Sequence, residues 1–362
     1  MHLLCSMPSG VFSKRCQEEM IDIYFDVFGT KIKVSSCCLN FISALKENLF
    51  YFKSRASKEC DIEIYFEYIN FPFKKDLNKF NEGSVLVCST GAKVYSGEGS
   101  ISIADFNIPG LSIKAKVDNW NYTINARYKL SKKSFILRRT PGPEDFLKIS
   151  RYLLQYPLFQ LMRERKGLFF IHASAIEING AGYVFFGLPG SGKSRCVMQL
   201  LRNEGAHFIS DNFLFFNTSK ELFAFPELLR IYEHWGSSWR ENSHVSRINI
   251  GKTKKSFFRV SEDTIKGRAK IQKAFFLKRA GAEKLAAVDT QEFISTLLAV
   301  EKFTKDFYEY SYIDLLNLSG VKLASLDCSR RSELAYLLNG IDCYDLFIEE
   351  GSANSRLLER IL

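Results

Sequence analysis

The residues whose types and spacing point most clearly to a chemical role lie at positions 187–194. This stretch, Gly-Leu-Pro-Gly-Ser-Gly-Lys-Ser, fits the Walker A pattern G-x-x-x-x-G-K-[ST] at every position. Glycines at Gly190 and Gly192 let successive backbone N–H groups turn inward around a phosphate, because no Cβ stands in the way. The pattern therefore predicts a P-loop that binds the phosphates of a nucleotide such as ATP.

Each polar residue at the end of this loop has a predicted role. Lys193 is expected to reach the β- and γ-phosphates, and Ser194 to ligate Mg²⁺. A helix that begins here would also direct its free N–H groups and its positive dipole end at the same anion. Arg195 is taken as a solvated helix residue rather than an arginine finger. The predicted nucleotide-binding residues are Gly187, Leu188, Pro189, Gly190, Ser191, Gly192, Lys193, Ser194 and Arg195.

Asp211 is the best candidate for a catalytic carboxylate. Phosphoryl transfer to a hydroxyl needs such a group near the attacking oxygen. Asp211 follows the apolar run 206–209, whose end we expect beside the P-loop in a parallel sheet, where ligands gather at strand ends. It is predicted to act as the base and to ligate Mg²⁺. The alternative is that Asp211 caps a helix or turn ahead of Asn212.

Two strands and a helix must position the P-loop. Residues 169–178 and 182–186 have the apolar pattern of β strands and are joined by a turn containing Asn179 and Gly180. Residues 195–203 continue with helical spacing. Strand, loop and helix thus follow in the order that the motif requires, which predicts an α/β domain with a central sheet and surrounding helices.

The first part of the chain has a different pattern. Residues 21–139 are largely β-like, with alternating stretches at 61–66 and 111–117 and one expected helix near 39–52. Prolines at 141 and 143 around Gly142 then oppose both helix and sheet, and a helix is expected from 144 to 164. We therefore predict a β-rich (α+β) N-terminal domain at residues 1–140, a candidate recognition module, and a P-loop catalytic domain at residues 141–362.

The region around the P-loop resembles a known family. Residues 172–178 read His-Ala-Ser-Ala-Ile-Glu-Ile, followed by Gly180-Ala181-Gly182, the P-loop and then Phe-Ile-Ser-Asp at 208–211. This resembles the catalytic domain of the HPr kinase/phosphorylase family over about residues 145–350, more weakly after residue 225. The resemblance implies an α/β, HPr kinase-like P-loop domain that uses ATP and Mg²⁺. Members of that family are often oligomers, so it also implies a homo-oligomer.

The resemblance adds His172 to the candidate catalytic residues. In that family the histidine before the P-loop is associated with the catalytic aspartate, whose position matches Asp211. A histidine has a pKa near neutrality and could hold a proton or orient the carboxylate. Taken alone, one histidine on an apolar strand is more often a core residue, so this role depends on the resemblance.

Two departures from the family pattern limit what can be carried over. The second acidic residue of its aspartate pair is Asn212 here, which keeps an oxygen ligand but loses a charge. The loop with asparagine, proline and glycine that the bacterial regulatory enzyme carries near its C-terminal end is not found. HPr itself is therefore not expected as the substrate, and reverse phosphorolysis becomes doubtful.

Two further charged residues are candidates for substrate binding. Arg230 lies one element after Asp211, where a guanidinium could clamp a phosphate or an acidic group of the substrate. A surface salt bridge is the alternative for Arg230. Glu227, three residues earlier, is a candidate second metal ligand.

Composition narrows the class of protein. The formal net charge of +10 suits an anionic partner, but the basic pieces are short and scattered, which argues against nucleic acid binding. The nine cysteines show no metal-binding spacing and are expected to be reduced and mostly buried. No apolar stretch approaches eighteen residues and no secretory signal is evident, so the expectation is no membrane span and a cytoplasmic protein.

The leading hypothesis is a kinase that transfers the γ-phosphoryl group of ATP to a hydroxyl. By resemblance serine is the favoured acceptor, in a peptide or protein, and a small molecule remains open. The alternative is a nucleotide-binding regulator or NTPase that acts on a protein partner through the N-terminal sheet, since residues 1–140 contain no catalytic constellation of their own.

Overall fold

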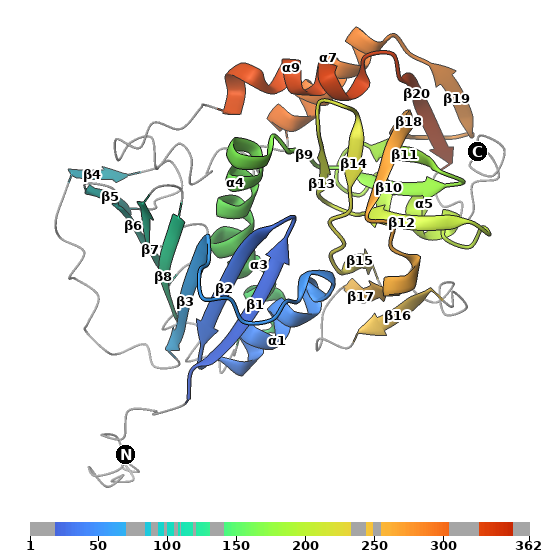
Figure 1. The fold of residues 1–362 in the computed structure, drawn as a ribbon. Coiled ribbons are helices and arrows are strands. Elements are labelled where there is room, and N and C mark those ends of the chain that lie inside the picture. The colour runs from blue at the N-terminus through green and yellow to red at the C-terminus, as the bar shows by residue number, and fades with distance from the viewer. Residues whose placement is uncertain are drawn as a thin grey trace, which may run out of the picture.

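The chain folds into a mixed α/β structure with several sheets (Figure 1). The computed structural model describes residues 19–69, 84–87, 93–97, 100–104, 108, 110–118, 121–130, 141–232, 244–248, 255–303 and 326–349. Within these ranges there are an eight-stranded sheet, a nine-stranded sheet and a small three-stranded sheet. The predicted Thr140 at the domain break lies outside the described residues.

The eight-stranded sheet is built by the N-terminal part of the chain. Its order is β1-β2-β3-β8-β7-β6-β5-β4, with β2–β3 and β3–β8 parallel and the other pairs antiparallel. Alternate residues of its strands point to one face, as Ile62, Ile64 and Phe66 do. The strands are β1 (Ile21–Val27), β2 (Thr30–Ser36), β3 (Ile62–Ile69), β4 (Ser84–Val87), β5 (Lys93–Gly97), β6 (Ser100–Ala104), β7 (Leu111–Asp118) and β8 (Asn121–Lys129).

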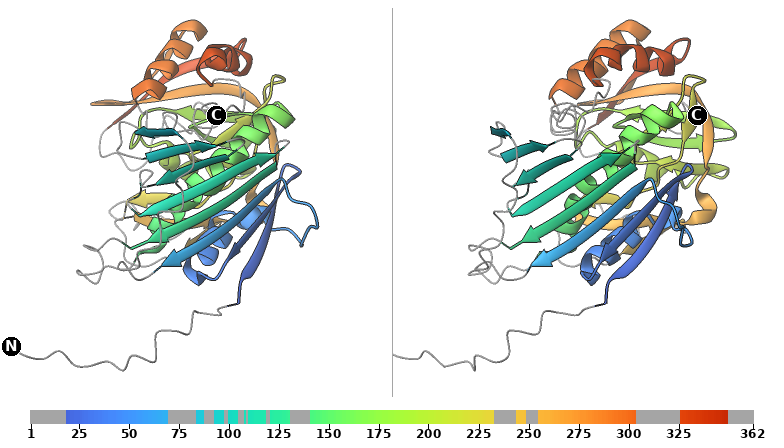
Figure 2. Two further views of the ribbon diagram at one scale, coloured as in Figure 1. Left: turned by 90° about the vertical axis from the view of Figure 1, so that its left-hand side faces the viewer. Right: turned by 60° about the vertical axis from the view of Figure 1, so that its left-hand side comes forward.

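Helices cover the apolar face of this sheet (Figure 2). α1 (Leu39–Asn48) and the short 3₁₀ helix η1 (Phe50–Phe52) lie within the predicted helix 39–52. The predicted helix 144–164 is also present, but it contains a π-helical turn that sequence periodicity did not indicate. Its parts are α3 (Pro143–Ser150), the π-helix η2 (Arg151–Gln155) and α4 (Tyr156–Lys166).

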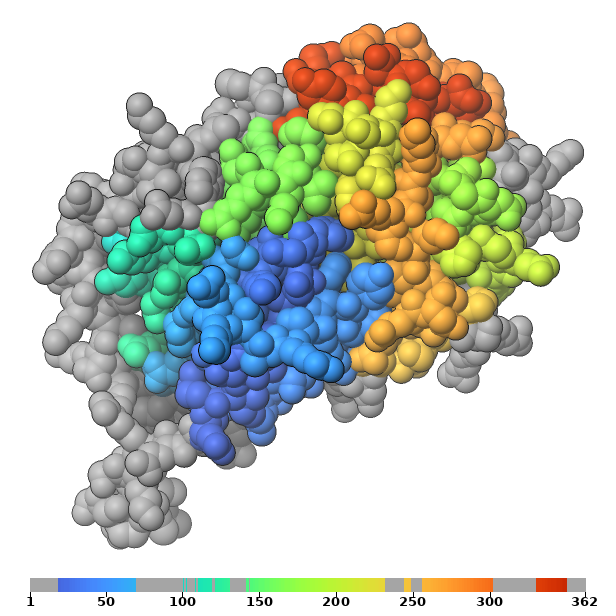
Figure 3. Space-filling model, in the orientation of Figure 1, coloured from blue at the N-terminus to red at the C-terminus, as the bar shows by residue number. Residues whose placement is uncertain are grey.

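The predicted domain break at residue 140 coincides with a helix start, since Gly142 caps α3 and Asp145 accepts a hydrogen bond from its backbone N–H. The hydrophobic core nevertheless continues across it. One cluster joins Ile64 and Ile124 of the eight-stranded sheet to Phe215 and other residues that follow the break. The N-terminal elements, drawn in blue, and the later elements, drawn in yellow to orange, accordingly lie against each other in Figure 3. The division into two domains therefore remains a prediction.

The nine-stranded sheet carries the P-loop sequence. Its main order is β12-β10-β11-β18-β14-β13-β9, with β20 parallel to β18 and β19 antiparallel to β20. The long strand β18 is its centre and runs parallel to β11. The strands are β9 (Phe169–Ile171), β10 (Ser174–Ile178), β11 (Ala181–Phe186), β12 (Ala206–Ser210), β13 (Leu214–Phe216), β14 (Glu221–Phe223), β18 (Arg268–Ala280), β19 (Lys284–Ala287) and β20 (Asp342–Glu349).

Both faces of this sheet are covered. Tyr183 and Phe185 of β11 pack in one cluster with α5 and the three-stranded sheet, while Val184 and Phe186 pack with α7 and α9, which lie above the sheet in Figure 1. Such a strand reads as a continuous apolar run rather than an alternating one. The remaining elements are α5 (Lys193–Leu200), α7 (Thr290–Phe303), α9 (Leu326–Leu338), the 3₁₀ helix η4 (Glu262–Thr264), β15 (Leu229–Tyr232), β16 (Val245–Ile248) and β17 (Lys255–Val260).

The prediction of a single strand over 169–178 was wrong. The strand is interrupted at His172 and Ala173, and β9 and β10 lie far apart in the sheet order. The turn after β10 is confirmed: Asn179 and Gly180 both have positive φ, 52° and 88°. Such a pair forms the tight two-residue turn that matches the twist of antiparallel strands, and Ile178 accordingly pairs with Ala181.

Two further expectations concern membrane-spanning helices and the cysteine thiols. Among the helices that the structure describes, none combines the length and apolar character needed to cross a membrane. The cysteines of the described ranges are free, as expected. Cys196 and Cys343 are buried, but Cys37, Cys38 and Cys60 are only half-buried, so the expectation that most are buried does not hold for the described cysteines. Burial raises the pKa of Cys196 to about 12, so its thiol packs in the core rather than acting as a nucleophile.

Candidate active site

The glycine-rich loop lies between β11 and α5, as the sequence predicts. Gly187, Gly190 and Gly192 all have positive φ, at 142°, 81° and 108°. A Cβ at Gly187 would come within 2.7 Å of the Ser191 Oγ and 3.0 Å of the Leu277 carbonyl oxygen. Glycine is therefore required at Gly187 by space as well as by conformation. At the tip of the loop, Leu188, Pro189 and Gly190 are exposed.

Lys193 points into this loop. Its Nζ donates hydrogen bonds to the carbonyl oxygens of Gly187, at 2.7 Å, and Leu188, at 3.1 Å. Burial lowers the pKa of Lys193 to about 8, although the charge of Asp211 opposes the shift. The ammonium group is thus held inside the loop, close to a carboxylate, where a phosphate would meet it.

Asp211 lies next to the loop, at the end of β12. Its Oδ1 accepts hydrogen bonds from the Oγ of Ser194, at 3.0 Å, and from the Oγ of Ser174. Burial raises the pKa of Asp211, while these two hydrogen bonds and the charge of Lys193 oppose the rise. Lys193, Ser194 and Asp211, three of the predicted site residues, are therefore brought together.

The route by which Asp211 reaches the loop differs from the prediction. β12 does not pair with β11 in a parallel sheet; it pairs antiparallel with β10, which lies between them. Since β11 and β12 are each antiparallel to β10, they run in the same direction and end at the same edge. Asp211 and the loop after Phe186 therefore meet across the start of β10, where Ser174 lies.

Ser174 is a site residue that the sequence reasoning missed. It is fully buried and donates to Asp211 from the first position of β10. A signal was available, because Ser174 stands two residues after His172 in a segment predicted to be a strand, and such residues share a face.

His172 lies in the break between β9 and β10. Burial and the charges of Lys193 and Arg151 lower the pKa of His172 to about 3, opposed by a hydrogen bond with the backbone of Asn212. The imidazole is therefore neutral at physiological pH. It adjoins the turn that carries Asp211, whereas the side-chain hydrogen bonds to Asp211 come from Ser174 and Ser194.

Glu177, at the other end of β10, has a structural role. Its carboxylate accepts hydrogen bonds from the backbone N–H of Gly180 and, at 2.8 Å, pairs with His207 Nδ1. It therefore fixes the β10–β11 turn, away from the strand end that carries Ser174.

Glu227 is buried beside Asn212 and is bound by three amides. Its Oε1 accepts hydrogen bonds from Asn48 Nδ2 at 2.9 Å and Gln155 Nε2 at 2.5 Å, and its Oε2 accepts one from Asn212 Nδ2 at 2.9 Å. Its charge raises the pKa of Asp211. Asn48 and Gln155 come from helices on either side of the predicted domain break, and no local sequence signal marks them.

Arg230 belongs to β15 and lies half-buried in the same region. Burial lowers the pKa of Arg230 to about 10, as does the charge of Arg151, while Glu227 and Asp211 oppose the shift. Arg151 was not among the predicted site residues. It opens the π-helix η2 and also lowers the pKa of His172, so the structure brings both arginines near the predicted catalytic residues.

Two other arginines flank the loop. Arg279, at the end of β18, donates from Nη2 to the carbonyl oxygen of Gly190 at 2.6 Å. Burial lowers the pKa of Arg195, and the charge of Arg279 adds to this effect. The predicted Arg195 is thus half-buried rather than solvated, and both guanidiniums increase the positive potential around the loop.

The residues beside the loop can be compared with the needs of a metal ion. No group of three or more His, Cys, Asp or Glu side chains is placed to hold a metal within the described ranges. The Ser194 hydroxyl and the Asp211 carboxylate, 3.0 Å apart, offer a pair of oxygen ligands beside the loop. Mg²⁺ in nucleotide sites takes one or two such protein ligands and completes its shell with phosphates and water, so this donor set fits Mg²⁺ bound together with a nucleotide.

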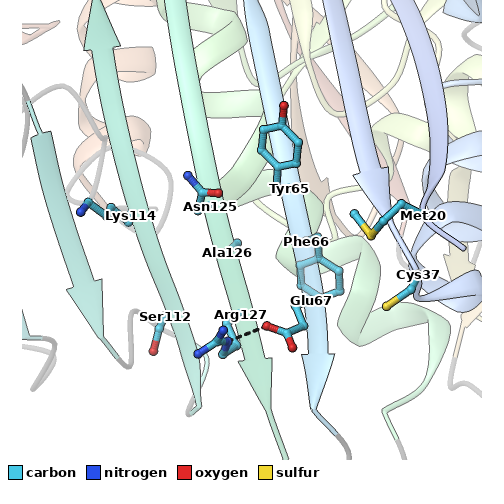
Figure 4. A pocket seen from close by; sticks show the side chains of 10 residues that line it. All are labelled: Met20, Cys37, Tyr65, Phe66, Glu67, Ser112, Lys114, Asn125, Ala126 and Arg127. Carbon is cyan, nitrogen blue, oxygen red and sulfur yellow. Dashed lines mark hydrogen bonds and ion pairs between the residues drawn. The ribbon is translucent and has the colours of Figure 1, made fainter. Parts of the chain in front are cut away.

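A separate groove lies on the outer face of the eight-stranded sheet (Figure 4). It has a volume of about 500 Å³, and Arg127 and Glu67 form an ion pair of 2.7 Å across it. Its lining is mixed, with polar side chains such as Lys114 and Asn125 beside apolar ones such as Met20 and Phe66. None of its residues belongs to the site around Asp211.

Comparison with known proteins adds one distant similarity. No family model and no curated protein matches this chain. Among solved structures, the Hpr(Ser) kinase/phosphatase from Coxiella burnetii is similar over 53% of this chain and 90% of its own length. The sequence identity is 10% and the TM-score 0.24. A similarity this distant carries no argument about activity, which must come from the residues themselves.

Proposed function

We propose that this chain is an ATP-dependent, Mg²⁺-requiring kinase, resembling HPr kinase, that transfers the γ-phosphoryl group to a hydroxyl. The acceptor is a serine of a peptide or protein, or a small molecule. The observation that supports this most is the hydrogen bond of 3.0 Å between Ser194 and Asp211 beside the buried Lys193. It joins a phosphate-binding loop to a carboxylate, which are the parts that phosphoryl transfer requires.

In this proposal Asp211 accepts the proton of the acceptor hydroxyl. The acceptor oxygen forms a bond to the γ-phosphorus, the bond from that phosphorus to the bridging oxygen breaks, and ADP leaves. The hydrogen bonds from Ser174 and Ser194 hold the Asp211 carboxylate at the edge of the loop, where the acceptor hydroxyl would approach. Lys193 and the loop N–H groups stabilise the charge on the transferring group.

Ser194 and Asp211 are the residues proposed to hold Mg²⁺. When bound, the ion would neutralise charge on the β- and γ-phosphates. Glu227 is a weaker candidate ligand than the sequence suggested, because three amide donors already occupy its oxygens.

His172 is proposed to position the turn that contains Asp211. With its pKa lowered to about 3, it is a poor proton store at neutral pH. Its hydrogen bond with the backbone of Asn212 supports a role in orienting the residues that follow β12.

A nucleotide-dependent regulator is the second candidate function. The observation that favours it is the hydrogen bond from Asn48 of α1 to Glu227, which links residues 1–140 to the surroundings of Asp211. Under this alternative, nucleotide occupancy would change what the N-terminal sheet binds. A hydroxyl acceptor that accelerates ATP consumption favours the kinase, whereas nucleotide-dependent partner binding without transfer favours the regulator.

The test is transfer of the labelled γ-phosphoryl group, with ATP and Mg²⁺, to free serine and to serine-containing peptides. Lys193→Ala is expected to lower kcat/KM by about 10²- to 10³-fold, because it removes charge stabilisation in the transition state. Lys284→Ala, which removes an exposed lysine of β19, is the matched control. Absence of transfer by the wild type to every acceptor, with nucleotide binding retained, would instead favour the regulator.

A further inference from the structure

Two arginines from separate elements converge beside the proposed catalytic residues. Arg151 comes from η2 and Arg230 from β15. Gln155, at the other end of η2, donates a hydrogen bond to Glu227, which stands three residues before Arg230. In agreement with this contact, the charge of Arg151 lowers the pKa of both Arg230 and His172. Two like charges in one half-buried place repel each other unless an anion lies between them.

Neither guanidinium has a carboxylate within ion-pairing distance in the part of the chain that the structure describes, and the Nε of Arg151 is buried with no hydrogen-bond partner. Two other arginines that the structure describes at low exposure contact carboxylates. Arg163 contacts Glu333 at 2.7 Å, and Arg330 contacts Glu301 at 2.5 Å. Leaving a buried cation without such a partner is unfavourable, which singles out Arg151 and Arg230.

The nearby buried carboxylate does not neutralise these arginines directly. Both oxygens of Glu227 are occupied by the side-chain amides of Asn48, Gln155 and Asn212. Neutral donors therefore hold Glu227 in place and leave the guanidinium N–H groups available to another anion.

The π-helical turn explains how Arg151 reaches this position. A π-helix adds a residue to the turn and is frequent at functional sites. In η2 it begins at Arg151 and ends at Gln155, so that Gln155 contacts Glu227 while Arg151 lies near Arg230 and His172. Both ends of this turn therefore serve the same site.

We propose that Arg151 and Arg230 form an anion-binding subsite for the phosphoryl acceptor, so that the acceptor carries a carboxylate or phosphate group close to its hydroxyl. This rests on the proposed kinase function. Paired guanidiniums suit such groups because their N–H donors match the oxygens of carboxylates and phosphates.

An anion at this subsite has two possible sources, the acceptor and the phosphates of the nucleotide. The glycine-rich loop has its own cations, since Lys193 lies inside it and Arg279 is bonded to Gly190. Arg151 and Arg230 belong to neither the loop nor α5, and Arg230 senses the proposed base Asp211. The acceptor is therefore the source that the observations favour.

The closing experiment measures sulfate binding by calorimetry to the full chain saturated with ADP and Mg²⁺, so that the loop is already occupied. Arg151→Gln and Arg230→Gln are each expected to weaken sulfate binding by about 10- to 100-fold, the value of a lost charged hydrogen bond. ADP affinity should stay unchanged. The matched control is Arg268→Gln, because the Arg268 side chain is 66% exposed.

A parallel measurement compares serine peptides flanked by glutamate with the same peptides flanked by glutamine. The wild type is expected to have a lower KM for the glutamate peptides, and both variants to lose this preference. Unchanged sulfate affinity in the variants would overturn the subsite. Loss of ADP affinity instead would assign the arginines to the nucleotide. Arginine-dependent sulfate binding without transfer to any hydroxyl would show that the proposed kinase, rather than the anion site, has failed.

Discussion

Two regions of this protein bury arginines, and they treat the charge in opposite ways. Between α4, α7 and α9, Arg163 and Arg330 share the buried carboxylate of Glu333, and Arg330 also contacts Glu301. Beside Asp211, no ion pair with a described residue forms at Arg151 or Arg230, and the nearest buried carboxylate is held by amides. The first arrangement places carboxylates in direct contact with its arginines, whereas the second leaves Arg151 and Arg230 without a carboxylate within ion-pairing distance among the described residues.

This difference separates a structural role from a functional one. A buried cation that already has its carboxylate fastens helices together and has little left to offer a ligand. A cation without a partner lowers stability in the free protein but is ready to bind an anion, as is common at functional sites. Substitutions in the paired region should therefore lower stability. Substitutions of Arg151 or Arg230 should instead weaken anion binding and leave stability unchanged or higher.

The largest expected effect on stability is at Glu333. Glu333→Gln removes the carboxylate that both Arg163, at 2.7 Å, and Arg330, at 2.9 Å, contact. Breaking such a buried network should lower the free energy of unfolding by about 3–5 kcal/mol. Chemical denaturation measures the change, with the exposed Glu59→Gln as a control expected to stay within about 0.5 kcal/mol. An effect of control size at Glu333 would remove the contrast between the regions.

A smaller, pH-dependent effect on stability is expected at His172, beside Arg151. The pKa of His172 is lowered from 6.5 to about 3. As the pH falls below 6.5, His172 therefore becomes protonated in the unfolded chain but stays neutral in the folded chain. Stability is therefore lost from pH 6.5 down to about 3. Between pH 7 and pH 5 the wild type should lose about 2 kcal/mol more than His172→Gln. Equal losses in denaturation at the two pH values would contradict the assignment.

The smallest expected effect, with the opposite sign, is at the arginine pair. Arg230→Gln removes a half-buried charge that repels Arg151, so the free energy of unfolding should stay the same or rise by up to about 1 kcal/mol. Thermal unfolding without added anions measures this. The Arg230 guanidinium lies over the Phe257 ring, 6.0 Å from its centroid, and a loss comparable with that of Glu333→Gln would mean that this packing, rather than a ligand, accounts for Arg230.

The parts of the fold that local patterns determine could be predicted. The alternating stretches at 61–66 and 111–117 lie within strands β3 and β7, and the loop lies between β11 and α5. The strand break at His172 could not be predicted, because its flanking residues are apolar on both sides and periodicity alone shows no interruption. The run 206–209 was expected to end beside the loop in a parallel sheet. β12 does end at the same edge as β11, but the antiparallel strand β10 lies between them, a pairing that depends on the whole sheet.

The residues of the candidate site also fall into those that local sequence patterns predict and those that long-range packing brings in. Lys193 and Ser194 follow from a contiguous motif, and Asp211 from its place at a strand end. Asn48 was missed because it reaches Glu227 over 179 residues, a contact that arises only when α1 packs against the later sheets. The position of Arg151 near the site could not be predicted, because it lies in a π-helical turn and hydrophobic spacing does not indicate such turns.

The most direct test of the central claim is a single-turnover comparison of the wild type with Asp211→Asn, at saturating ATP and Mg²⁺ and with an acceptor that the wild type phosphorylates. Removal of the base should slow transfer by about 10²- to 10⁴-fold, while Asp342→Asn at an exposed aspartate of β20 leaves it unchanged. ATP binding should be retained in both variants. Transfer at the wild-type rate in Asp211→Asn would contradict the proposal that Asp211 is the base of a kinase.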